Sequence, residues 1–99
     1  MRPLLRGESP LFVVDVKRRA LRAIPDLLVS QRVEIRRLFD ALEDDPVPYH
    51  SYDVAKLEGA QNAYRVRLGG SRVVYVVDWK SSVITVTRIE PRGRAYKGL

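Results

Sequence analysis

Hydrophobic residues follow two different periods along the chain. Up to Leu42 they recur mostly at spacings of three and four, which is typical of helices, and from Tyr64 onward they alternate with polar residues, which is typical of strands. The stretch from Leu11 to Asp15 is rich in β-branched and aromatic residues and predicts a short strand. We therefore expect one strand, then helices, then a sheet.

The helical spacing is interrupted at Pro25. Proline ends a preceding helix and suits the first turn of a following one. The acidic residues 43–45 and Pro46 are expected to end the second helix. We predict an antiparallel helical hairpin with two apolar stripes, which are Val16, Ala20, Leu21 and Ile24 before the proline, and Leu28, Ile35, Leu38, Phe39 and Leu42 after it.

Three alternating stretches follow a loop, residues 45–62, that has no strong period. They are residues 64–68, 72–79 and 83–89, and short turns join them. The 99 residues carry one continuous pattern, so we expect a single domain over residues 1–99. Its predicted class is α+β: a short N-terminal strand, a helical hairpin and a three-stranded antiparallel meander, with the helices packed on one face of the sheet.

The composition narrows the possible chemistry. The chain has no cysteine and one histidine, His50, so thiolate and multi-histidine metal sites are excluded, and we expect no metal and no cofactor. The N-terminal apolar runs are too short and too charged for a signal peptide or a membrane span, so we expect a cytoplasmic protein without a membrane partner.

The net charge of +6 lies in the second part of the chain. Residues 1–55 hold nine basic and nine acidic side chains, whereas residues 56–99 hold nine basic and three acidic ones. Six of those nine basic residues are arginine, whose planar fork suits phosphate oxygens. This distribution is consistent with nucleic-acid binding and equally with an ordinary solubilising surface.

Strand alternation predicts which side chains share a face. With an even loop between the first two meander strands, Arg65, Arg67 and Arg72 share one face with Val74 and Val76, and the other face carries Tyr64, Val66, Leu68, Val73, Tyr75 and Val77. A two-residue loop places Arg67 directly opposite Arg72, which is unfavourable without a nearby acid. Either both arginines extend into water, or the pair holds an anion. Two arginines alone would favour the first of these. Because three arginines converge and the Arg92 segment follows the neighbouring strand, we favour an anion site.

Arginine can orient a phosphate and stabilise charge that develops on it, but it cannot act as a general base. Attack of a ribose 2′-hydroxyl on the adjacent phosphodiester needs little more than such positioning. The candidate proton carriers, Tyr96, Lys56 and Lys97, have ordinary pKa values of about 10. None is poised near pH 7, which argues against a fast free-standing nuclease and favours an enzyme that uses another assembly to position its RNA.

Three motifs resemble the RelE family of toxin–antitoxin ribonucleases, and the archaeal RelE proteins in particular. They are KLEG at residues 56–59, YRVRLGGSRVVYVVDW at 64–79 and PRGRAYK at 91–97, and the likeness extends from Phe12 to Lys97. The resemblance implies a toxin that enters the ribosomal A site, cleaves mRNA there by attack of the 2′-hydroxyl on the adjacent phosphate, and so inhibits translation. The first ten residues have no counterpart in the family.

The resemblance also implies roles for individual residues. The catalytic residues would be Arg65, Arg72, Arg92 and Tyr96, where Arg72 stabilises the transition state and Tyr96 stacks on a base or transfers a proton. The residues that bind RNA or the ribosome would be Lys56, Leu57, Arg67, Arg94 and Lys97. Well-studied bacterial members carry lysine at the two strand positions that Arg65 and Arg67 occupy here, so a lysine acting as base at those positions is not available.

The implied partners are the ribosome with its mRNA and a RelB-like antitoxin, in a toxin–antitoxin complex that is a heterotetramer. Two alternatives stay open. One is a ParE-like toxin, which inhibits DNA gyrase and has no need of this set of residues. The other is a catalytically silent member that binds RNA or the ribosome.

Overall fold

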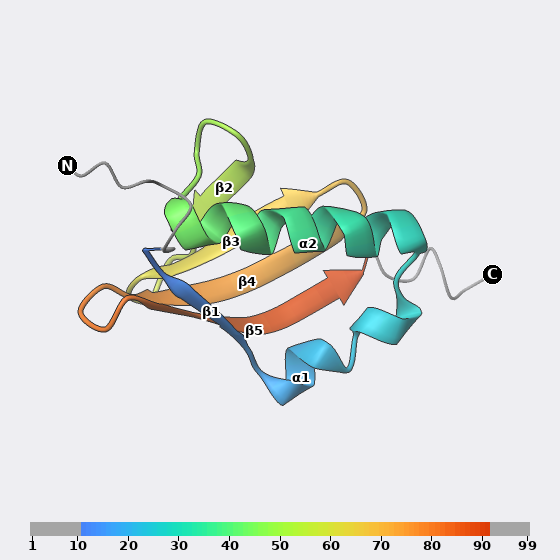
Figure 1. The fold of residues 1–99 in the computed structure, drawn as a ribbon, viewed down its shortest axis with the longest axis horizontal. Helices are drawn as coiled ribbons and strands as arrows, with labels where there is room; N and C mark the ends of the chain where they lie inside the picture. Colours follow the sequence, from blue (N-terminus) through green and yellow to red (C-terminus); the bar gives the residue numbers. More distant parts are fainter. Residues whose placement is uncertain (1–10, 92–99) are drawn as a thin grey trace.

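The computed structural model describes residues 11–91. Within them a five-stranded sheet, in the order β1-β5-β4-β3-β2, carries a long helix across one face (Figure 1). The strands are β1 (Val13–Val16), β2 (Asp53–Lys56), β3 (Ala63–Leu68), β4 (Ser71–Asp78) and β5 (Val83–Pro91). The predicted α+β class is confirmed, with β3, β4 and β5 as the antiparallel meander.

The helical part is less symmetric than the sequence predicted. The first helix, α1 (Arg18–Leu21), has four residues and gives way to a 3₁₀ turn, η1 (Ile24–Asp26), that contains Pro25. Since proline lacks an N–H and clashes with the preceding turn, the first helix is cut short. The second helix, α2 (Val29–Asp44), has sixteen residues and is much longer than α1. No helix of residues 11–91 is long and apolar enough to cross a membrane.

Both ends of α2 have local causes. At its start the backbone N–H of Leu28 donates to the Gln31 side-chain oxygen at 2.8 Å, which satisfies one of the donors that a helix start leaves unpaired. At its end Asp45 is extended and Pro46 follows, and a residue before proline disfavours helical geometry. The predicted end of this helix is therefore confirmed.

The sheet has more strands than the meander. Strand β2 lies within residues 45–62, where the sequence predicts a loop, and it pairs antiparallel with β3. Four residues, DVAK, are too few to show a period of two. Strand β1 pairs parallel with β5, with Val13 opposite Val83, so the sheet is mixed. Periodicity identifies a strand but cannot say which distant strand it will join.

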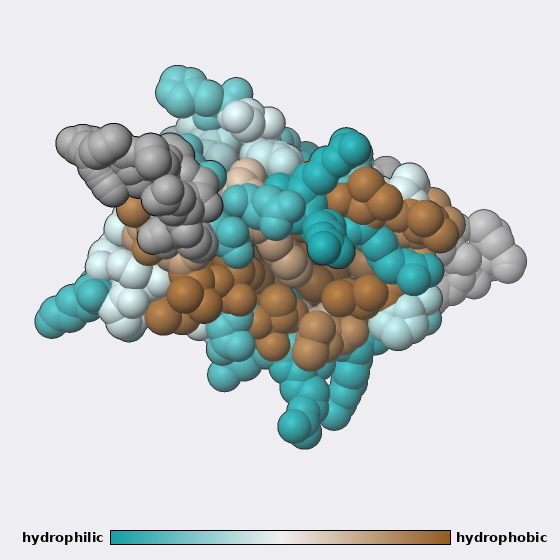
Figure 2. Space-filling model, in the orientation of Figure 1, coloured by the Kyte–Doolittle hydropathy of each residue, from teal (hydrophilic) through white to brown (hydrophobic). Residues whose placement is uncertain are grey.

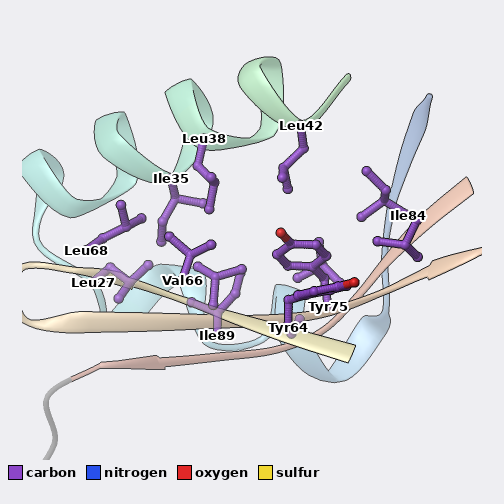
Figure 3. Close-up of a cluster of buried hydrophobic side chains, with 14 residues drawn as sticks. Leu27, Ile35, Leu38, Leu42, Tyr64, Val66, Leu68, Tyr75, Ile84 and Ile89 are labelled. Carbon is purple, nitrogen blue, oxygen red and sulfur yellow. The ribbon is translucent and has the colours of Figure 1, made fainter. Parts of the chain in front are cut away.

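The core lies between α2 and the sheet (Figure 3). Leu38 and Leu42 of α2 are fully buried against the strand residues that alternation assigned to this side, which are Tyr64, Val66, Leu68, Val73, Tyr75 and Val77. Each side chain of this size stabilises the fold by about 1.5–3 kcal/mol when buried. We call this side of the sheet the helix face.

Tyr75 adds a polar connection inside the core. Its hydroxyl donates to the Pro46 carbonyl oxygen at 2.7 Å, which ties β4 to the loop that follows α2. Its ring stacks on that of Tyr64 with centroids 5.7 Å apart. Burial raises the pKa of Tyr75 far above its ordinary value of 10. This tyrosine is a core residue, on the same face as Val73 and Val77, where alternation placed it.

Some apolar side chains remain at the surface. Leu28, Val29 and Val33 are exposed at the N-terminal end of α2, where Figure 2 shows hydrophobic side chains gathered. Helical spacing turns Val29 and Val33 away from the buried stripe of Ile35 and Leu38. We call these three residues the α2 apolar patch.

Candidate nucleic-acid interface on the second face of the sheet

Within residues 11–91, the face of the sheet turned away from α2 carries four arginines. Arg65 and Arg67 come from β3, Arg72 from β4 and Arg88 from β5. The neighbours of Arg65, Arg67 and Arg72 along their strands are buried, so the two-residue period turns these arginines to the other side. Arg88 pairs with Val74, which lies on that same side, and the next residue, Ile89, is buried. The predicted grouping of Arg65, Arg67 and Arg72 is therefore confirmed as a geometric statement. We call these four residues the arginine face.

The turn that joins β3 and β4 sets this register. Leu68 pairs with Ser71, so the loop is the two residues Gly69 and Gly70, and Arg67 lies directly opposite Arg72, as predicted. Gly69 has φ +55°, a backbone conformation that glycine adopts without strain. Two-residue hairpins commonly require it at this first central position, which fixes the two arginines across from each other.

The assumption that no acid lies near this pair is wrong. Across the sheet, Asp53 of β2 lies opposite Arg67, and Glu90 of β5 lies opposite Arg72, so the row reads acid, arginine, arginine, acid. Asp53 comes from β2, a strand that the sequence did not predict. Glu90 lies one residue beyond the predicted end of the third meander strand, and its position opposite Arg72 follows a register shift that the sequence did not predict. They offset part of the repulsion between the two central guanidinium groups.

Glu90 contacts two of the arginines. One carboxylate oxygen lies 3.6 Å from Nε of Arg72, and the other accepts a hydrogen bond of 3.1 Å from Nη1 of Arg88. The side chains of Arg72 and Glu90 are 51% and 40% exposed. Ion pairs this exposed contribute between zero and about 1 kcal/mol, so an incoming anion can compete with Glu90.

A hollow of about 240 Å³ opens at the end of the hairpin. Its lining consists of Arg67, Gly69, Gly70, Ser71, Arg72, Glu90 and Pro91. Two guanidinium groups and the glycine backbone thus border one cavity. Pro91 pairs with Ser71 at its rim, and the chain continues from Pro91 to Arg92.

Arg65 lies two residues from Arg67 on the same strand and face. Its Nη1 atom is buried and has no hydrogen-bond partner among the described residues. A buried donor without a partner costs roughly 1–3 kcal/mol, and more when it is charged. Arginine stays charged at ordinary pH. The described part of the fold therefore places a cationic donor here with no hydrogen-bond acceptor against its Nη1 atom.

Two predicted RNA-binding residues lie apart from the arginine face. Lys56 pairs with Tyr64, which places it on the helix side of the sheet, and it lies at the end of β3 away from the Gly69–Gly70 turn. Leu57 follows it in the loop between β2 and β3. Together with residues 58–61 they line a second hollow, of about 570 Å³. The structure does not bring Lys56 and Leu57 together with the arginines.

The predictions for Arg92, Arg94, Tyr96 and Lys97 fall on residues outside the described part of the chain. They stay predictions. Across residues 11–91 no group of three or more His, Asp or Glu side chains is placed to hold a metal ion. What the described part of the site offers is cationic hydrogen-bond donors, which can position a phosphate but cannot accept a proton.

Arg88 is a residue of the arginine face that the sequence did not predict. The register between β4 and β5 shifts at Val74 and Tyr75, so Val86 pairs with Tyr75 but Arg88 pairs with Val74. Thr87 is the extra residue, and its hydroxyl donates to the Val74 carbonyl oxygen at 3.3 Å. Strict alternation would have put Arg88 on the helix face. The sequence does contain a sign of this bulge. The apolar residues Val86 and Ile89, both buried in the structure, are three residues apart and not two.

Sequence comparison then identifies the family. No family model matches the chain. Over 86 residues, however, it is 36% identical to a Methanocaldococcus jannaschii protein named "Putative toxin RelE1", an alignment that spans 87% of this chain and 96% of that protein. The chain belongs to the RelE toxin family. The resemblance to archaeal RelE proteins inferred from the motifs is confirmed.

Solved RelE structures share this fold. The toxin in the archaeal RelE-RelB complex from Pyrococcus horikoshii superposes with a TM-score of 0.76 at 37% identity, over 85% of this chain and 98% of that one. The toxin in the intact Escherichia coli RelBE toxin-antitoxin complex gives a TM-score of 0.69 at 24% identity, over 84% and 99%. The match to the Escherichia coli structure shows a common fold. The match to the Pyrococcus horikoshii structure shows both a common fold and a clear similarity in sequence.

Proposed function

We propose that this RelE-family chain is the toxin of a type II toxin–antitoxin system and acts as a ribosome-dependent endoribonuclease. It cleaves mRNA in the ribosomal A site and thereby stops translation in the cytoplasm. The observation that carries the proposal is the arginine face: four guanidinium groups on one side of the sheet, two of which line a hollow.

The reaction that this face suits is transfer within the RNA strand. The 2′-oxygen forms a bond to the adjacent phosphorus while the bond from phosphorus to the 5′-oxygen breaks. The products are a 2′,3′-cyclic phosphate and a 5′-hydroxyl, and the proton lost by the 2′-hydroxyl is balanced by one gained by the 5′-oxygen. Arg67 and Arg72 would hold the phosphate, and Arg72 would stabilise the negative charge that builds on it.

The proton steps need groups other than arginine. Lys56 lies on the helix side of the sheet, away from the arginine face, so we assign these steps to Tyr96 or Lys97. Their ordinary pKa values of about 10 make them weak proton carriers at neutral pH. The ribosome would hold the mRNA with its 2′-hydroxyl aligned on the adjacent phosphate, and this positioning would compensate for weak proton transfer. We therefore propose that cleavage depends on the ribosome.

We further propose that a RelB-like antitoxin binds this chain, as RelB binds RelE in the solved Pyrococcus complex. The net charge of +6 favours an acidic partner. The α2 apolar patch offers a surface that a helix of the antitoxin would cover, and Arg32 and Arg36, both exposed on α2, flank it. We propose a heterotetramer of two toxins and two antitoxins, which light scattering of the co-expressed complex would measure.

The test is cleavage in a translating extract. The purified protein is added, and the 5′ ends of the mRNA are mapped by primer extension. Cleavage at A-site codons is expected, and Arg72→Ala should reduce its rate by about 10²–10³-fold, as loss of a charge-stabilising group does in other enzymes. Arg36→Ala removes the same charge from the outer side of α2 and should leave the rate unchanged. Arg92→Ala tests the sequence-based assignment in the same way.

The outcomes separate the alternatives. Intact mRNA together with blocked gyrase supercoiling would replace the proposal with ParE-like inhibition. Intact mRNA with the protein bound to ribosomes would identify a silent member. Growth arrest on expression would not discriminate, because both classes of toxin cause it.

A further inference from the structure

Glu90 holds two arginines of the arginine face at once. Its Oε1 and Oε2 atoms each approach a different guanidinium group, at 3.6 Å for Arg72 and 3.1 Å for Arg88. A carboxylate and a phosphodiester both present two oxygens that share one negative charge. Arg72 and Arg88 are therefore already arranged around an anion of the kind that an RNA backbone carries.

We propose that Arg88 is a phosphate-binding residue of this site, and that Glu90 is a built-in counter-anion that an RNA phosphate displaces from Arg72 and Arg88. The inference rests on the proposed function, since it takes RNA as the ligand of the arginine face. It adds a fourth arginine to the set predicted from the sequence and gives a role to an acidic residue within a basic surface.

The exposure of the three side chains makes the exchange feasible. The side chains of Arg72, Arg88 and Glu90 are 51%, 42% and 40% exposed, so each reaches solvent. Each guanidinium has five N–H groups, and the contact with Glu90 engages few of them. An arginine can therefore begin to bind a phosphate with its remaining donors before it releases the carboxylate.

The bulge at Thr87 supports a binding role for Arg88. One extra residue in β5 keeps Ile89 buried on the helix face and turns Arg88 and Glu90 to the arginine face. Bulges commonly re-aim side chains next to functional sites. Here the bulge delivers Arg88 beside Arg72.

Glu90 also has a consequence for the free protein. Arg67 and Arg72 lie opposite each other, and Arg88 lies two residue pairs further along the β4–β5 ladder, on the same face. Without Glu90 these like charges would face each other with less compensation. Glu90 thus lowers the repulsion in the free toxin and, for the same reason, weakens its affinity for RNA.

The test measures RNA binding without cleavage. The probe is a short fluorescein-labelled RNA with 2′-O-methyl groups, which cannot undergo the reaction, and binding is followed by anisotropy at several salt concentrations. Arg88→Gln should weaken binding about 5-fold and reduce the salt slope by about 0.7, the value for one lost phosphate contact on a single strand. Arg88→Lys, which keeps the charge, should retain most of the slope.

Glu90→Gln should tighten binding of the same probe about 3–10-fold. Its matched control is Glu34→Gln, which removes one negative charge from an exposed position on α2, away from the arginine face. That control should tighten binding less than 2-fold, through net charge alone. Circular dichroism and thermal melting establish that all variants fold, and the salt slope is not moved by a purely structural effect.

Three results would overturn the inference. They are equal effects of Glu90→Gln and Glu34→Gln, an unchanged salt slope in Arg88→Gln, or no binding of the probe by the native chain. The first two would leave ribosome-dependent cleavage intact if the translating extract shows it. Conversely, the protein could show the expected changes in probe affinity and salt slope and still leave mRNA uncut. That result would support the phosphate-binding site and would contradict the proposed nuclease activity.

Discussion

Strands β3, β4 and β5 present different residues on the two sides of the sheet. The two sides differ in which features of the chain decide where their residues lie. The helix face carries apolar residues whose two-residue period is visible in the sequence, and they are buried against α2. The arginine face carries charges whose mutual positions depend on register, on a two-residue turn and on a bulge. The first face contributes apolar burial to stability, and the second places like charges close together, with Asp53 and Glu90 as partial compensation.

This contrast predicts that substitutions on the two faces have separable effects. The largest effect is expected for Leu38→Ala, since Leu38 is fully buried at the centre of the helix face. It should lower the free energy of unfolding by about 2–5 kcal/mol, measured by urea denaturation. Val33→Ala on the outer side of α2 is the control, with a change of about 0.5 kcal/mol or less. Equal losses in both variants would mean that α2 is packed differently.

The next effect is that of Tyr75→Phe. It removes the hydroxyl that donates to the Pro46 carbonyl oxygen and should cost about 1–2 kcal/mol of stability at pH 7. Tyr49→Phe, at an exposed loop tyrosine, should cost almost nothing.

Tyr75 also gives the helix face a dependence on pH. Because burial raises its pKa in the folded state, the folded protein retains the phenolic proton at pH values where the unfolded chain has lost it. The stability from this group is complete below pH 10, the ordinary tyrosine value, and falls as the pH rises above it. The native protein should therefore lose stability above pH 10 more steeply than Tyr75→Phe does, and parallel curves would contradict the assignment.

On the arginine face we expect a trade between stability and binding. Arg65→Met replaces a side chain that has a buried, unpartnered nitrogen by an apolar one of similar length. It should raise the free energy of unfolding by about 1 kcal/mol while weakening RNA binding. A loss of stability in this variant would show that the Arg65 guanidinium is better satisfied than we infer.

The smallest effect on stability is expected for Arg67→Ala. It removes the like charge opposite Arg72, so the free energy of unfolding should change by less than about 0.5 kcal/mol. Its effect should instead appear in RNA binding, as a salt slope lower by about 0.7. An unchanged slope would count against contact between Arg67 and a phosphate.

The sequence revealed much of the helix face and only part of the arginine face. Alternation and the glycine pair predicted that Arg67 lies opposite Arg72, because both signals are local. The acids Asp53 and Glu90 could not be placed beside these arginines, since that required the pairing of β2 and the bulge in β5. The short strand β2 gave no period, and Pro25 shortened the first helix more than the apolar stripe suggested.

The position of β5 within the sheet has a consequence for synthesis of the protein. Strand β5 lies between β1 and β4, yet it is the last of the five strands to leave a ribosome. Until β5 emerges, β1 has no strand to pair with in the sheet, because Val13 pairs with Val83 of β5. Such non-local pairing slows folding. The nascent chain therefore cannot complete the arginine face, because Arg88 and Glu90 arrive with the strand that closes the sheet.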